Sequence, residues 1–264
     1  MRFGGFAFDR ALARQRLSCA RTNGPPRMPS VLYTMSGLVM RHVKKIDDIA
    51  DLLEAVSDFS TANAGGTVVY RGVKSAEYEL IPKIGRRTRD GQPLSVAGEK
   101  YVLKLFKQRS VPHLTRMPAD EWEWLSLAQH HGLPTRLLDW TRNPLVALYF
   151  AIAEPHHGDA AVYAYRSTTY LQLDKHPDPF KVERVARVIP SHVSTRIAVQ
   201  SGLFTVHPEP TKPFSANVTK FIVAGVKRRQ IKKGLSRLGV DTGSMFPDID
   251  GIARHIDWLR TDEL

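Results

Sequence analysis

The chain has 264 residues, of which 42% are hydrophobic and 24% charged, and its formal net charge is +12. These values predict a soluble globular protein with one large domain, long enough to bury a core without disulfides. The lone cysteine, Cys19, excludes an internal disulfide and favours a reducing, cytoplasmic compartment. No apolar run reaches the roughly 18 residues of a membrane span, and no secretory signal is evident.

Part of the positive charge belongs to the N-terminal segment. Residues 1–40 hold six arginines and one acid, so the other 224 residues carry +7. The stretch "TNGPPRMPS" breaks any periodicity, and Met28, Met35 and Met40 are alternative starts. We interpret residues 1–40 as a disordered extension or a mis-assigned start, with a mitochondrial transit peptide as the alternative. Residues 41–264 are expected to form the folded domain.

The expected elements follow one another in a mixed order. Helices are predicted at residues 46–59, 95–109, 120–132, 143–154, 227–239 and 244–259. Strands are predicted at residues 67–73, 133–141, 160–166, 196–200, 203–207 and 219–224. Ser95, Asp120 and Asn143 are the expected N-caps. Because the strands cluster late and do not alternate regularly with helices, we expect an α+β fold with mixed or antiparallel sheets flanked by helices.

The common catalytic motifs are absent from the sequence. It has no P-loop, no G-x-G-x-x-G, no H-E-x-x-H and no G-x-S-x-G. His130 and His131 are neighbours on a predicted helix, where side chains of adjacent residues point about 100° apart. They are therefore a poor pair for binding one metal ion, and no metal is expected.

The motif "YRG", Tyr70 to Gly72, suggests a binding site. An arginine at the end of a buried strand presents a fork of donors that suits phosphate or carboxylate. The glycine would leave room for a ligand beside the backbone. A structural salt bridge to an internal acid explains Arg71 equally well.

The stretch "QHHGLPTRLLDW" holds two further candidates, Arg136 and Asp139. In an extended strand they lie on opposite faces, so they need not pair with each other. Asp139 needs another partner, which is Arg71, Arg136 through a kink, or a ligand hydroxyl. Trp140 either stacks on a flat ring or fills the core, and the core is the commoner role.

In "RIAVQSGLFTVH", Arg196 and Gln200 lie four residues apart on one face of a predicted strand. Ordinary solvent-facing polar groups explain this pair most simply. The basic stretch 227–237 is interpreted as a solvated helix face or, alternatively, as a nucleic-acid contact.

The chain resembles the FRG domain family, which is named for an F/Y-R-G motif. The resemblance runs through "VYRGV", "ELIPKIGR", "WEWLSLAQHHGLPTRLLDWTRNPLVALYFA", "TRIAVQSGLFTVH" and "SMFPDIDGIARHI", and covers residues 42–259. A weaker resemblance links the order of these motifs to ADP-ribosyltransferases of the R-S-E type. In that comparison Arg71 takes the place of the arginine, Asp139 to Thr141 that of the serine-threonine-serine strand, and Gln200 that of the catalytic glutamate.

The second resemblance implies that NAD is the substrate. Its phosphates would lie on Arg71, helped by Arg136, and its base near Tyr70 or Trp140. The ribose hydroxyls would meet Asp139 or Gln200. Because Gln200 carries no charge, Asp139 would have to supply the carboxylate that stabilises an oxocarbenium-like transition state.

Three classes of function therefore remain. The first is an NAD-utilising ADP-ribosyltransferase or glycohydrolase without the usual glutamate. The second is a non-catalytic module that binds a nucleotide, or nucleic acid through residues 227–237 with strong salt dependence. The third is a hydrolase that uses His130 or His131.

Overall fold

The computed structural model describes residues 44–61, 65–86, 88–89, 92–189 and 199–263. These residues belong to one compact unit, Met35–Leu264. The interpretation of residues 1–40 as an extension falls outside the described residues. In the part of the chain that is described, none of the helices combines the length and apolar character needed to cross a membrane.

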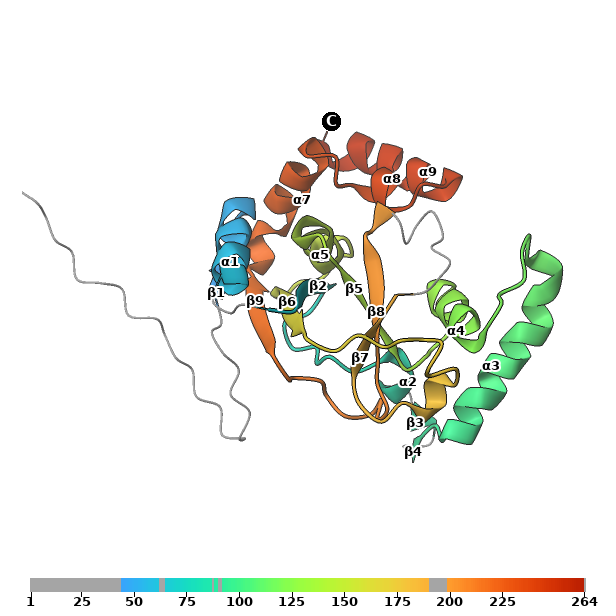
Figure 1. The fold of residues 1–264 in the computed structure, drawn as a ribbon. Coiled ribbons are helices and arrows are strands. Elements are labelled where there is room, and N and C mark those ends of the chain that lie inside the picture. Colours follow the sequence, from blue (N-terminus) through green and yellow to red (C-terminus); the bar gives the residue numbers. More distant parts are fainter. Residues whose placement is uncertain (1–43, 62–64, 87, 90–91, 190–198, 264) are drawn as a thin grey trace, which may run out of the picture. The chain divides into compact units, whose positions relative to one another are not determined.

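The centre of the fold is a seven-stranded sheet with strand order β1-β9-β6-β2-β5-β8-β7 (Figure 1). Its strands are β1 (Lys44–Ile46), β2 (Thr67–Val73), β5 (Leu137–Thr141), β6 (Ala160–Ser167), β7 (Ala186–Val188), β8 (Gly202–Val206) and β9 (Val218–Val223). β1 runs parallel to β9, and the other neighbouring strands are antiparallel. A separate ladder pairs β3 (Thr88–Arg89) with β4 (Gln92–Pro93). The expected α+β fold with a mixed sheet is thus confirmed.

The described helices surround this sheet. They are α1 (Ile49–Thr61), α2 (Lys83–Arg86), α3 (Val96–Ser110), α4 (Glu121–His130), α5 (Pro144–Ile152), α7 (Arg228–Arg237), α8 (Thr242–Met245) and α9 (Ile249–Trp258). Short 3₁₀ turns (Val111–His113, Pro179–Lys181 and Gly225–Lys227) and a final π-helical turn (Leu259–Glu263) complete the set. The predicted N-caps are confirmed, because Ser95, Asp120 and Asn143 each accept a hydrogen bond from a backbone N–H of the first turn.

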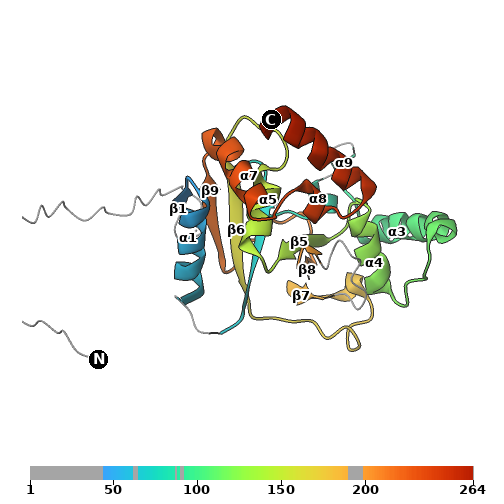
Figure 2. The same cartoon turned by 90° about the horizontal axis from the view of Figure 1, so that it is seen from above.

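One face of the sheet carries two separate apolar clusters. Helices α1, α5, α7 and α8 pack over β9, β6 and β2, with Leu148 and Leu235 fully buried among them. At the other end, α3 and α4 pack over β5, β8 and β7, around Trp122 and Leu137. In Figure 2, α1, α5 and α7 lie on one side of β5 and β8, and α3 and α4 lie on the other. A third cluster, which includes Trp140, lies on the opposite face.

Helix α5 lies in direct contact with β2 at Gly72. A Cβ atom added to Gly72 would come within 1.9 Å of the Ala147 carbonyl oxygen and 2.5 Å of the Ala151 nitrogen. The space beside this glycine is therefore filled by the α5 backbone. The prediction that Gly72 leaves room for a ligand is wrong, and Arg71 lies inside β2 rather than at its end.

The sheet is nearly interrupted between β2 and β5. β2 pairs with β6 over seven residues, and β5 pairs with β8 over five. In contrast, β2 and β5 share the single pair Tyr70 and Thr141. We call this junction the β2–β5 seam.

The third predicted strand region starts later than expected. β8 begins at Gly202, and Gln200 lies in the turn before it, next to Ser201 with a left-handed φ of 48°. Gln200 is therefore not on a strand. Arg196 and most of its predicted strand fall outside the described residues.

Candidate functional site

A cavity of about 630 Å³ lies over the β2–β5 seam. Gln129 and His130 of α4 contribute to one wall, and Ala147 and Phe150 of α5 contribute to another. Seven of the residues predicted from the sequence line it, namely Tyr70, Arg71, His130, Asp139, Trp140, Thr141 and Gln200. The structure thus brings residues from distant segments of the chain to one cavity.

Arg71 and Asp139 meet across the seam. One terminal nitrogen of Arg71, Nη1, donates to the backbone carbonyl of Asp139 at 2.7 Å and lies 3.4 Å from its Oδ2. The arginine side chain thereby supplies a hydrogen bond where β2 and β5 no longer pair. The Asp139 side chain is 55% exposed and that of Arg71 is 18% exposed, so the carboxylate faces the cavity while the guanidinium is largely buried. Of the partners considered for Asp139, the structure selects Arg71.

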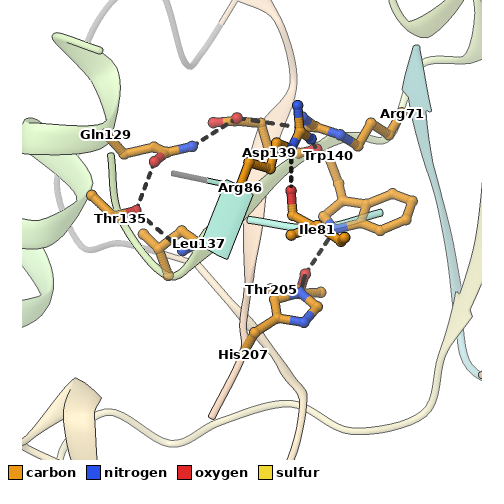
Figure 3. Close-up of polar contacts among 10 residues, drawn as sticks. All are labelled: Arg71, Ile81, Arg86, Gln129, Thr135, Leu137, Asp139, Trp140, Thr205 and His207. Carbon is orange, nitrogen blue, oxygen red and sulfur yellow. Dashed lines mark hydrogen bonds and ion pairs between the residues drawn. The ribbon is translucent and has the colours of Figure 1, made fainter. Parts of the chain in front are cut away.

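Gln129 donates to the same carboxylate oxygen of Asp139 that Arg71 contacts (Figure 3). Its Nε2 donates to Asp139 Oδ2 at 2.8 Å, and its Oε1 accepts from the Thr135 hydroxyl at 2.7 Å. The Thr135 oxygen in turn accepts from the Leu137 N–H at 3.1 Å. Since the Asp139 carboxylate only accepts, the Gln129 amide nitrogen is directed to Asp139, and its oxygen is left to accept from the Thr135 hydroxyl. Gln129 and Thr135 were not among the site residues predicted from the sequence.

Two cations of α2 lie at the same part of the site. Lys83 lines the cavity, and its Nζ donates to the Gly132 carbonyl at 2.7 Å. Arg86 donates through Nε to the Ile81 carbonyl at 2.7 Å. The pKa of the Arg86 guanidinium is lowered, first by desolvation and then by the positive charge of Arg71. The two guanidinium groups therefore lie within electrostatic reach of each other.

The aromatic residues divide between cavity and core. The Trp140 indole is 2% exposed, donates through Nε1 to the Thr205 hydroxyl at 2.8 Å and packs 5.4 Å from the Tyr165 ring. It belongs to the core on the face opposite Asp139, which is the commoner of the two roles considered for it. Tyr70 is 4% exposed, and burial raises the pKa of its phenol. Phe150 is half-buried and lines the cavity, although the sequence analysis did not select it.

Arg136 lies away from the cavity. Its side chain is 1% exposed, and its Nε and Nη2 donate to the two carboxylate oxygens of Glu99 at 2.9 and 3.1 Å. Its guanidinium also lies 4.9 Å from the centre of the Phe180 ring. A buried arginine with a paired carboxylate is a structural element, since leaving either charge alone would be costly. The prediction that Arg136 helps to bind phosphate is therefore wrong.

Thr141 and Gln200 are linked by a hydrogen bond at the cavity edge. The Thr141 hydroxyl donates to the Gln200 carbonyl at 2.6 Å and accepts from the Asn143 N–H at 3.0 Å. The Gln200 amide donates to the Met245 carbonyl at 3.0 Å. Its proton donors are thus directed at α8, which leaves its side-chain oxygen as the group that can accept from a ligand hydroxyl.

His130 lines the cavity, and its ring meets that of His131 edge-on at 5.0 Å. Within the described residues, no group of three or more histidine, cysteine, aspartate or glutamate side chains is placed to hold a metal ion.

The basic stretch 227–237 is not exposed to solvent along its whole length. Arg228 is buried and donates to the backbone carbonyls of Gly158, Ala151 and Lys74. Lys232 lies 4.9 Å from the Trp258 ring centre. Arg228 is therefore a structural residue rather than part of a solvated face.

Comparison with known proteins adds one finding. The model of the FRG domain matches residues 66–160, which run from β2 through α5 and include Arg71, Gln129 and Asp139. No curated protein and no solved structure matches the chain. The resemblance to ADP-ribosyltransferases therefore rests on the sequence motifs alone. The family prediction is confirmed over this range, since residues 66–160 match the model of the FRG domain.

Proposed function

We propose that the cavity over the β2–β5 seam binds NAD and that the protein transfers or hydrolyses its ADP-ribose group. The observation that carries the proposal is that Arg71, Asp139 and Gln200 line one cavity, although they come from three distant segments. A volume of about 630 Å³ is within the range of small-molecule sites.

Asp139 is the residue best placed for the chemistry. Cleavage breaks the bond between the ribose carbon and the nicotinamide nitrogen, and the electron pair leaves with nicotinamide. Water or an acceptor side chain adds to the ribose carbon and loses a proton. A fixed carboxylate near the developing positive charge stabilises this transition state. Asp139 presents an exposed carboxylate whose orientation is set by Arg71 and Gln129.

The other groups have supporting roles in the same proposal. Gln200 offers its side-chain oxygen to a ribose hydroxyl, and Phe150 offers an apolar surface to a flat ring. Arg71 holds the Asp139 backbone in place and adds positive charge at the end of the cavity where phosphates would lie.

The test compares NAD consumption by the wild type and the Asp139→Asn variant. This substitution keeps the shape and removes the charge, so we expect turnover to fall by about 100-fold or more. Binding of ADP-ribose, measured by calorimetry, should change by only a few-fold. Asp174→Asn, at an exposed position outside the cavity lining, is the matched control. If the wild type neither binds nor consumes NAD, the proposal is wrong.

A second candidate function is nucleotide binding without catalysis. One observation favours it: the Asp139 carboxylate already has Arg71 and Gln129 as partners, which partly compensate its charge. In that case the wild type would bind NAD without consuming it. The same calorimetric titration therefore separates the two functions.

A further inference from the structure

Helix α2 presents two cations toward the Arg71 side of the cavity. Lys83 and Arg86 lie three residues apart on this short helix, and we call them the α2 cation pair. Lys83 borders the cavity directly, and Arg86 lies beside Arg71 and Asp139 in Figure 3. Neither residue was among the site residues predicted from the sequence.

The charges at this end of the cavity do not balance. Arg71, Lys83 and Arg86 bring three positive charges to this end. Among the described residues, Asp139 is the one carboxylate whose charge acts on the pKa of Arg86. Among the described residues, Lys83 and Arg86 donate to the neutral carbonyls of Gly132 and Ile81 and form no ion pair. The Lys83 contact also satisfies a carbonyl after the end of α4, which gives it a structural role too.

We propose that the α2 cation pair binds the pyrophosphate bridge of a dinucleotide whose reacting ribose lies over Asp139. This inference rests on the proposed function, because it places the rest of the same ligand. A pyrophosphate carries two negative charges and several acceptor oxygens. Lys83 and Arg86, which form no ion pair within the described part of the chain, provide the matching donors, and guanidinium binds such oxygens in pairs. The phosphate role expected for Arg136 is thereby assigned to α2.

The experiment measures binding of ADP-ribose and of inorganic pyrophosphate by calorimetry at fixed salt, without divalent metal. The variants are Lys83→Gln and Arg86→Gln, which keep a hydrogen-bond donor and remove the charge. Each should weaken both probes by roughly tenfold or more, because a charge-assisted hydrogen bond is lost. Lys83→Arg, which keeps the charge, should bind within a few-fold of the wild type.

The control is Lys45→Gln on β1, at the far edge of the sheet from β5. It lowers the net charge by the same amount and should leave both affinities unchanged. An equal loss in this variant would show a general charge effect and overturn the proposal. Melting temperatures of all variants exclude loss of folding as the cause.

The outcomes separate the inference from the proposed function. If pyrophosphate binds through Lys83 and Arg86 but NAD does not bind, the anion site stands and the proposed function fails. If ADP-ribose binds the wild type, Lys83→Gln and Arg86→Gln equally, the anion site is wrong and the proposed function stands. Absence of binding by both probes overturns both.

Discussion

His207 is a buried histidine that directly follows β8. Its side chain is 2% exposed, and burial together with the charge of Arg71 lowers its pKa to about 3. The Thr205 oxygen accepts from the Trp140 indole N–H and lies 2.8 Å from His207 Nε2. The direction of the hydrogen bond between the Thr205 hydroxyl and Nε2 depends on which ring nitrogen carries the proton.

This environment predicts a pH-dependent loss of stability. The unfolded chain protonates His207 below its ordinary pKa of 6.5, whereas the folded chain stays neutral down to about 3. Stability is thus independent of this group above pH 6.5 and falls as the pH decreases from 6.5 toward 3. Between pH 8 and 5.5, the wild type should lose about 1 kcal/mol that His207→Gln does not lose.

Urea unfolding at several pH values measures this difference. Glutamine can hydrogen-bond to Thr205 and does not titrate, so the variant should lose this part of the pH dependence of its free energy of unfolding. The exposed His156→Gln variant should retain the wild-type slope. Parallel slopes for the wild type and His207→Gln would show that His207 is not the responsible group.

Some site residues could be predicted from the sequence, and others could not. The sequence identified Arg71 and Asp139, since a lone arginine and a lone acid near buried strands need partners. It misassigned Arg136, because its partner Glu99 lies 37 positions away on another element. Gln129 and Lys83 carry no local signal, as their roles arise only when α4 and α2 pack beside β5.

At the scale of elements, the contact of α5 with β2 depends on Gly72. A methyl group at this position would overlap the Ala147 carbonyl oxygen and the Ala151 nitrogen, both of which belong to the helix backbone. Backbone atoms cannot change rotamer, so the helix itself would have to move. The glycine of the YRG motif is therefore explained by packing.

We expect Gly72→Ala to destabilise the protein by about 3 kcal/mol or more, at the upper end of overpacking effects. Gly158→Ala is the matched control, because its new methyl would lie 3.4 Å from the His156 side chain, which can move. Urea unfolding at pH 8 compares the two variants. Equal stability of both would contradict the packing explanation.

The elements themselves were mostly predictable. Polar caps and apolar periodicity located α3, α4 and α5 with their N-caps, since these signals are local. The beginning of β8 was not predictable, because Gln200 is held in its turn by Thr141 and Met245, which are distant in sequence. The β2–β5 seam could not be predicted from the sequence either, because it depends on how two strands diverge in space.

On the scale of the whole molecule, the FRG match covers only part of the sheet. Residues 66–160 contain β2 and β5 but lack β8, β9 and β7, and they include only the first residue of β6. Without β8, the five-residue ladder of β5 is lost, and the cluster around Trp122 loses Phe204 and Val206.

We therefore expect a fragment of residues 66–160 to remain unfolded, while residues 41–264 fold cooperatively. Dispersion of amide signals in proton–nitrogen correlation spectra of the two fragments measures this difference. A well-dispersed spectrum of the short fragment would show that the matched segment is an autonomous domain. The α+β class was predictable from the order of elements, but the strand order was not, because it is set by long-range pairing.

The seam also has a topological consequence. It divides the sheet into a block of β1, β9, β6 and β2 and a block of β5, β8 and β7. In sequence order the chain crosses between these blocks after β2, after β5, after β6 and after β8. Neither block is a continuous segment, so four covalent tethers join two halves that share a single residue pair. The covalent connections between the two blocks therefore hold the sheet together at the point where its backbone hydrogen bonding is weakest.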